Sequence, residues 1–209
     1  MTAPRIAVLD YGAGNLRSME KALVRAGGDA FVTSDADEAA KADALVVPGV
    51  GNFGQCATRF RDEGLAELAR TWVDDGRPLL GVCVGMQILY ESSEEAPDTP
   101  GLGLLAGRVR RLPSDVTVPH MGWNTLEPVA DDRLLEGLAG AHAYFVHSYY
   151  VEPDDDHVVA TCDYGARIAA LVRAGGVVAT QFHPEKSSDV GARLLANWVA
   201  DVAHRERAA

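Results

Sequence analysis

Residues 78–87 have the sequence PLLGVCVGMQ, in which Cys83 ends a short apolar run and has a glycine two residues to either side. A strand that turns sharply into a helix at such a residue is a nucleophile elbow, and the pattern predicts one here with sulfur as the nucleophile. Gly81 and Gly85 leave room where the two backbones pass closely, and Cys83 itself is expected to hold a strained conformation. A helix beginning near Val84 would aim backbone N–H groups at the sulfur and favour the thiolate. Most isolated cysteines are buried structural residues, but the symmetric glycines favour the reactive role.

A base for this cysteine is offered by His183-Pro184-Glu185, which follow the apolar run VVATQF at residues 177–182. If the strand continues through them, His183 and Glu185 project to the same side while Pro184 stiffens the exit. A carboxylate bound to one imidazole nitrogen fixes the tautomer and stabilises the imidazolium that forms when the other nitrogen accepts the thiol proton. A lone histidine near a strand end is more often structural. Together with the upstream cysteine, however, this pair predicts a Cys-His-Glu triad of Cys83, His183 and Glu185.

A candidate oxyanion hole is the loop PGVG at residues 48–51, which follows the apolar run ALVV at residues 44–47. Such a run is typical of a buried parallel strand. Glycines on both sides of Val50 let its peptide plane rotate. The N–H groups of Val50 and Val84 are therefore expected to hold an oxyanion, an interaction worth about 3 kcal/mol per donor. A Pro-Gly turn is also a common connection between a strand and a helix. We therefore assign the oxyanion role to this loop only because Cys83 is present.

The first half of the sequence alternates between strand and helix patterns. Strands are expected at residues 5–10, 29–33, 44–47 and in the run that ends at Cys83, and helices at residues 15–26, 35–41 and 53–75, the last broken near Gly64. This order predicts an α/β fold with a central, mostly parallel sheet, helices on both faces and right-handed crossovers. In such sheets reactive groups gather at the carboxyl ends of the strands. Four residues fall at or just past such ends, which predicts a single site: Asp10, Gly49, Cys83 and His183.

The second half has a different pattern. Short β-like runs with glycine and proline punctuation occupy residues 101–127, and further strands are expected at residues 144–151 and 157–161. They predict an antiparallel β excursion added to the parallel core. A polar loop at residues 94–100 is expected to be exposed, and a final helix at residues 189–203 to pack on the sheet.

The glycine-rich segment GAGNLR at residues 12–17 follows the first strand and suggests a dinucleotide-binding loop. The third glycine of that fingerprint is replaced by Arg17, so a nicotinamide cofactor is not expected. Asn15 is instead expected to cap the helix that begins there.

The composition is compatible with a small metabolic enzyme. The chain has 209 residues, 47% of them apolar, which suits one core and a single domain spanning residues 1–209. Its 19 basic and 30 acidic residues give a net charge of -11, and such a surface repels nucleic acid and anionic membranes. The sequence has no signal-peptide pattern and no apolar run of membrane-spanning length, so the cytoplasm is expected. The three cysteines lack metal-ligand spacing; no metal or cofactor is expected, and Cys56 and Cys162 are expected to be buried fillers.

Five segments, two of which extend the PGVG loop and the His183–Glu185 pair, carry a resemblance to a known family: YGAGN at 11–15, PGVGNF at 48–53, HMGWN at 120–124, FVHSY at 145–149 and HPEKSS at 183–188. Together with the elbow they resemble the class I, triad-type glutamine amidotransferases, and within these the glutaminase subunits of imidazole glycerol phosphate synthase from histidine biosynthesis. The resemblance spans nearly the whole chain, with no departure at a triad position. It implies a flavodoxin-like fold and hydrolysis of glutamine to glutamate and ammonia through a thioester.

The resemblance also implies what binds to the chain. Four residues would hold the substrate: Gly51, Gln87, Ser148 and Tyr149. Ammonia would pass to a (β/α)8-barrel cyclase subunit, which makes imidazole glycerol phosphate and aminoimidazole carboxamide ribotide, because this chain has no room for a synthase domain. Five residues would face that cyclase in a heterodimer: Asn15, Met121, Trp123, Tyr144 and Lys186. Ordinary roles remain open for several of these, namely a solvated Gln87, a strand packing pair Ser148 and Tyr149, core aromatics Trp123 and Tyr144, and a plain surface Lys186.

The mobile peptide at Val50 suggests control. The isolated chain is expected to hydrolyse glutamine poorly because this N–H faces away from the site, and the partner with its nucleotide is expected to turn it inward. Two alternative functions remain. One is a glutaminase subunit that feeds a different synthase. The other is a catalytically silent regulatory domain of the same fold, which is disfavoured because such a domain would be expected to have lost the elbow or the base.

Overall fold

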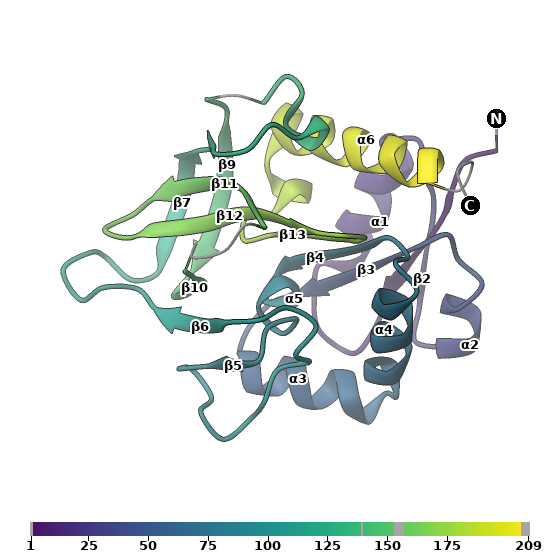
Figure 1. Ribbon diagram of the computed structural model, residues 1–209, viewed down its shortest axis with the longest axis horizontal. Helices are drawn as coiled ribbons and strands as arrows, with labels where there is room; N and C mark the ends of the chain where they lie inside the picture. Colours follow the sequence, from purple (N-terminus) through teal and green to yellow (C-terminus); the bar gives the residue numbers. More distant parts are fainter. Residues whose placement is uncertain (1, 139, 153–156, 206–209) are drawn as a thin grey trace.

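Eight strands form the central sheet of the computed structural model, which describes residues 2–138, 140–152 and 157–205 (Figure 1). In order across the sheet they are β2 (Asp29–Thr33), β1 (Arg5–Leu9), β3 (Ala44–Gly49), β4 (Leu79–Cys83), β13 (Val177–Thr180), β12 (Arg167–Ala174), β11 (Val158–Asp163) and β8 (Glu127–Pro128). Neighbours among the first five are parallel, and each later strand is antiparallel to the one before it. The carboxyl ends of β3, β4 and β13 therefore meet at one edge of the sheet, as the sequence predicts.

Helices cover both faces of this sheet. In Figure 1, α1 (Leu16–Arg25) and α6 (Ser188–Arg205) lie on one side, while α3 (Phe53–Asp62) and α4 (Leu65–Asp74) lie on the other. A short helix, α2 (Ala36–Ala39), connects β2 to β3. The helix expected at residues 53–75 is indeed broken at Gly64, whose φ of 72° is left-handed and suits glycine. None of the helices in the described part of the chain is long and apolar enough to span a membrane.

Asn15 does not cap α1 in the way the sequence predicts. It precedes the helix, but its ψ of 62° departs from the extended conformation of a capping residue, and its side chain makes no capping hydrogen bond. Asn52 shows the difference at α3. With φ −99° and ψ 137°, its side chain accepts a hydrogen bond from the Gln55 N–H at 3.1 Å.

The second half departs further from expectation. The run expected as one strand at residues 144–151 forms two, β9 (His142–His147) and β10 (Tyr149–Val151), separated by Ser148. β9 pairs with β7 (His120–Thr125) in a two-stranded ribbon, called the β7–β9 ribbon below. β10 joins a separate sheet with β6 (Arg108–Arg111) and β5 (Ser92–Ser93). The run AYFVHSYYV contains no glycine or proline to mark this change of sheet.

One long strand was not expected at all. β12 lies between β11 and β13, and its residues from Ile168 to Val172 are buried. A strand buried on both faces loses the alternation of polar and apolar residues that identifies a strand in a sequence. Among the described residues there are also two short 3-10 helices: η1 (Arg133–Leu135) and η2 (Pro184–Lys186).

Candidate active site

The predicted elbow is present where β4 meets α5 (Val84–Gln87). Cys83 has φ 55° and ψ −113°, a conformation that is rare for any residue except glycine. A Cβ added to Gly85 would lie 1.9 Å from the Val47 carbonyl oxygen, and one added to Gly81 would meet the Met86 Cα at 3.0 Å. The glycines therefore serve the close approach of backbones expected of them. Since α5 is a single turn, its effect on the sulfur would come from its first N–H groups rather than from a long helix dipole.

The two glycines beside Val50 serve different purposes. A Cβ on Gly49 would lie 2.2 Å from the Gly85 nitrogen, so this glycine lets β3 pack against the elbow. Gly51, in contrast, has φ +95° and open space around it, so it is a glycine because of its backbone conformation. The Val50 side chain is 40% exposed between them.

His183 and Glu185 meet, although not on a strand as expected. β13 ends at Thr180, and His183 immediately precedes η2, which starts at Pro184. The tight turn brings His183 Nδ1 to 2.9 Å from Glu185 Oε1, and both side chains are 2% exposed. The His183 N–H donates to the Tyr144 carbonyl at 3.0 Å, which ties the turn to β9.

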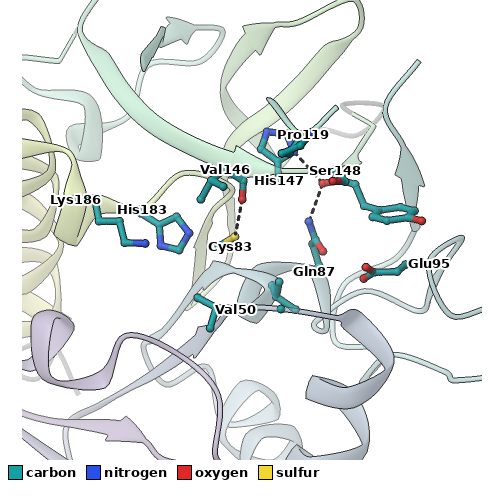
Figure 2. A pocket seen from close by; sticks show the side chains of 13 residues that line it. Val50, Cys83, Gln87, Glu95, Pro119, Val146, His147, Ser148, His183 and Lys186 are labelled. Carbon is teal, nitrogen blue, oxygen red and sulfur yellow. Dashed lines mark hydrogen bonds between the residues drawn. The ribbon is translucent and has the colours of Figure 1, made fainter. Parts of the chain in front are cut away.

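The electrostatics of this turn favour a charged imidazole. Burial lowers the pKa of His183, but hydrogen bonds and charge interactions with the Cys83 sulfur and with Glu185 outweigh it and raise the pKa to about 9. The second Glu185 oxygen, Oε2, is buried and has no hydrogen-bond partner among the described residues, so the imidazolium is the main compensation for this carboxylate. Figure 2 shows the His183 ring beside the Cys83 sulfur.

A cavity of ≈ 380 Å³ opens above the sulfur (Figure 2). It brings together most residues that the sequence assigns to catalysis and substrate binding: Val50, Gly51, Cys83, Val84, Gln87, Ser148, Tyr149 and His183. Glu185 lies behind His183, outside the lining. No group of three or more His, Cys, Asp or Glu side chains suited to a metal ion exists in the described residues.

Gln87 is buried rather than solvated, so the ordinary role left open for it is wrong. Its side-chain nitrogen donates to the Tyr149 carbonyl at 2.8 Å and to Gln181 Oε1 at 3.0 Å. Gln181, which the sequence reasoning missed, is fully buried and places its own Nε2 3.8 Å from Cys83 Sγ. A polar residue inside the apolar run VVATQF was the available signal.

Glu95 also lines the cavity and was not expected there. It belongs to the polar loop at residues 94–100, and its carboxylate accepts the Phe53 N–H at 2.7 Å. An acidic residue in an exposed loop has nothing in its local sequence to indicate that it faces a site.

The residues assigned to a partner surface lie mainly at the β7–β9 ribbon. Met121 is 64% and Trp123 53% exposed, and both project from the same face of β7 because they are two residues apart. Trp123 is therefore not a core aromatic; its ring meets the half-buried Tyr144 edge-on at 6.0 Å. Lys186 is exposed at the rim of the cavity, and Asn15 is partly buried.

The other two cysteines are buried fillers, as expected. Burial raises the pKa of Cys56 to about 11 and that of Cys162 to about 12, which keeps both thiols protonated at neutral pH. Cys56 donates to the Val50 carbonyl at 3.5 Å and so helps to hold the loop.

Comparisons with known proteins agree with this geometry. Residues 7–202 match the family described as Glutamine amidotransferase class-I. The chain is 50% identical over 194 residues to "Imidazole glycerol phosphate synthase subunit HisH" of Methanothermobacter thermautotrophicus, covering 93% of this chain and 97% of that protein. It is 47% identical over 208 residues to the protein of the same name from Geobacillus thermodenitrificans, covering 96% and 98%. A solved structure titled "Crystal structure of glutamine amidotransferase" matches with a TM-score of 0.75 at 27% identity, covering 95% of this chain and 98% of that one.

Proposed function

The chain belongs to the class-I glutamine amidotransferase family, and on that basis we propose that it is the glutaminase subunit of an imidazole glycerol phosphate synthase. The observation that carries the proposal is that Cys83 and His183 line one cavity, with Glu185 hydrogen-bonded to His183 from behind. The chain supplies ammonia from glutamine to a cyclase subunit, which uses it to make imidazole glycerol phosphate.

The reaction passes through a thioester. The Cys83 sulfur attacks the carboxamide carbon of glutamine, and the protonated His183 gives its proton to the departing ammonia. The neutral imidazole then takes a proton from water, whose oxygen attacks the thioester carbon. The C–S bond breaks, glutamate leaves with its carboxyl proton lost to solvent, and the Cys83 thiolate and protonated His183 are restored. Glu185 keeps the imidazole oriented throughout and stabilises its charge. The N–H groups of Val50 and Val84 hold the oxyanion of each tetrahedral intermediate.

The hydrogen bonds of the cavity suggest how substrate is held. Both N–H bonds of the Gln87 amide already have partners, so its carbonyl oxygen is the atom left to accept a bond from substrate. Glu95 offers a carboxylate to the substrate's ammonium group. Gly51, Ser148 and Tyr149 supply backbone around the carboxylate end of glutamine.

The acceptor chemistry belongs to the cyclase, for which we propose a (β/α)8 barrel in a heterodimer with this chain. Ammonia in water is protonated and diluted, so it has to leave the cavity under cover of the partner. The exposed Met121 and Trp123 offer apolar anchors of the kind that dominate interfaces, and we assign Lys186 at the cavity, Asn15 and Tyr144 to the same surface.

The test is to mix the chain with a candidate barrel cyclase and its phosphoribosyl-formimino carboxamide nucleotide, and to measure glutamate release together with nucleotide turnover. Glutamine-dependent turnover is expected with the native chain and none with Cys83→Ala, while added ammonium salt supports the cyclase with both. Undiminished glutamine-dependent turnover with Cys83→Ala contradicts the proposed nucleophile. Stimulation only by a different synthase contradicts the proposed partner, and equal glutaminase rates with and without cyclase and nucleotide refute the switch at Val50.

A further inference from the structure

Gln181 is a fully buried amide at the centre of the site whose two polar ends both have partners. It directly follows β13, and its main-chain N–H donates to the Ala170 carbonyl at 3.0 Å. Its Oε1 accepts from Gln87 Nε2 at 3.0 Å, and its Nε2 lies 3.8 Å from Cys83 Sγ. Burying an amide is unfavourable unless both ends are hydrogen-bonded, so this side chain is held in one place.

The direction of these hydrogen bonds is determined by a main-chain carbonyl. Tyr149 C=O can only accept, so Gln87 has to turn its NH2 group toward it, at 2.8 Å. The second N–H of that group points at Gln181, whose facing atom must therefore be the oxygen. The atom of Gln181 that faces Cys83 is then its NH2 group. A backbone carbonyl on β10 thus fixes an N–H donor at the sulfur, two side chains away.

The carbonyl is itself fixed from the β7–β9 ribbon. It accepts a second hydrogen bond, from His147 Nδ1 at 3.0 Å, which leaves His147 Nε2 to accept from His120 Nδ1 at 3.0 Å. Burial lowers the pKa of His147 to about 3 and that of His120 to about 4, so both rings are neutral at neutral pH and each holds a single tautomer. Every bond from His120 to the sulfur therefore has a defined donor.

We propose that Gln181 is a positioning residue for the nucleophile, which holds the Cys83 sulfur for attack and favours its anionic form by donating an N–H group to it. The inference rests on the proposed function, in which Cys83 is the nucleophile. The sulfur has a competing neighbour, the Val146 carbonyl at 4.0 Å, which can only accept the S–H of a neutral thiol. An N–H donor is worth more to a charged acceptor than to a neutral one, so Gln181 shifts the balance toward the thiolate.

Gln181→Glu tests this directly. One carboxylate oxygen still accepts the bond from Gln87, while the atom that faces the sulfur changes from a donor to an acceptor. Gln55→Glu makes the same chemical change at an exposed position on α3 and controls for added charge. The measurement is the rate of Cys83 alkylation by iodoacetamide as a function of pH, followed by mass spectrometry of the Cys83 peptide. Gln181→Glu is expected to react roughly tenfold more slowly at neutral pH, with its profile moved to higher pH and kcat lowered at a nearly unchanged KM, while Gln55→Glu matches the native chain.

A second variant covers the case in which the buried carboxylate takes up a proton or prevents folding. Gln181→Met has a similar length and no hydrogen-bonding group, and the same direction of change is expected. A native alkylation profile in folded Gln181→Met overturns the inference, because methionine has no N–H or O–H group to donate to the sulfur. Such a result leaves the proposed function intact as long as Cys83→Ala is inactive, whereas glutaminase activity that persists in Cys83→Ala removes the proposed function itself.

Discussion

The elbow and the β7–β9 ribbon face the same cavity but hold their residues there by different means. At the elbow, backbone packing fixes the position of Cys83, because glycines let β3, β4 and α5 approach until no Cβ fits between them. At the ribbon, side-chain hydrogen bonds hold the residues in place. They run from two neutral buried histidines of the ribbon to a carbonyl on β10, and from there through the amides of Gln87 and Gln181. The first arrangement resists small movements and is broken by a methyl group. The second is disrupted when a histidine of the network is protonated. Variants and pH changes should therefore affect the two regions differently.

The largest effect is expected at the strained residue of the elbow. Both Cys83→Ala and Cys83→Gly should lower glutaminase activity by about 10⁴-fold or more, because the nucleophile is gone. The glycine variant should be the more stable of the two, although glycine usually destabilises a folded protein relative to alanine. Glycine adopts φ 55° without strain, so Cys83→Gly should be more stable to urea than Cys83→Ala by about 1 kcal/mol despite losing a buried methyl. If the alanine variant is the more stable one, the elbow does not store strain.

The close approach of backbones is tested next. In Gly85→Ala the new methyl would lie 1.9 Å from the Val47 carbonyl oxygen, deep in the sheet, and a loss of at least about 4 kcal/mol in unfolding free energy is expected. Gly103→Ala is the control. Its φ of +65° is also unfavourable for alanine, but nothing lies within 4 Å, so a loss of about 1 kcal/mol is expected by the same denaturation measurement. Equal losses would mean that conformation, not contact, explains the glycine at the elbow.

The ribbon should respond to acid. The pKa values of His120 and His147 are lowered to about 4 and about 3 in the folded chain, against an ordinary value near 6.5 when unfolded. Below pH 6.5 these two histidines therefore bind protons in the unfolded chain but not in the folded chain. The free energy of unfolding falls as pH falls, by at most about 1.4 kcal/mol per pH unit for each histidine. Urea denaturation between about pH 7 and pH 4 measures this slope.

A double variant, His120→Asn with His147→Gln, should flatten that slope, while the exposed His142→Gln should leave it unchanged. A slope that survives in the double variant assigns acid sensitivity to other groups. The pKa of His183 is shifted in the opposite direction from those of His120 and His147. Its pKa is raised to about 9, so it contributes stability that is complete below pH 6.5 and is lost toward pH 9.

The contrast between the two regions also explains what the sequence could predict. Cys83 was recognisable because backbone geometry limits the positions beside it to glycine, and the His183–Glu185 pair because a base with a nearby carboxylate complements that cysteine. Gln181 and Glu95 were not, because their roles depend on partners 98 and 42 residues away; a polar residue in an apolar run marks Gln181 as unusual but does not identify its partner. β12 was missed for a related reason, since burial on both faces removes the alternation that marks a strand.

The smallest effect on the isolated chain is expected on the outer face of the ribbon. Trp123 is 53% exposed and packs edge-on with Tyr144, on the side of β7 opposite His120 and Asn124. Trp123→Ala should therefore change the unfolding free energy by less than about 1 kcal/mol and leave basal glutaminase activity unchanged. Trp198→Ala, in which a fully buried indole on α6 is removed, should cost about 3–5 kcal/mol by the same assay. Because an exposed tryptophan that contributes little to its own fold is a typical anchor for a partner, Trp123→Ala should nevertheless weaken cyclase binding by roughly 30-fold. If Trp123→Ala loses as much stability as Trp198→Ala, then Trp123 is part of the core of the ribbon. In that case the outer face of the ribbon would not be a binding surface separate from the hydrogen bonds that position the sulfur.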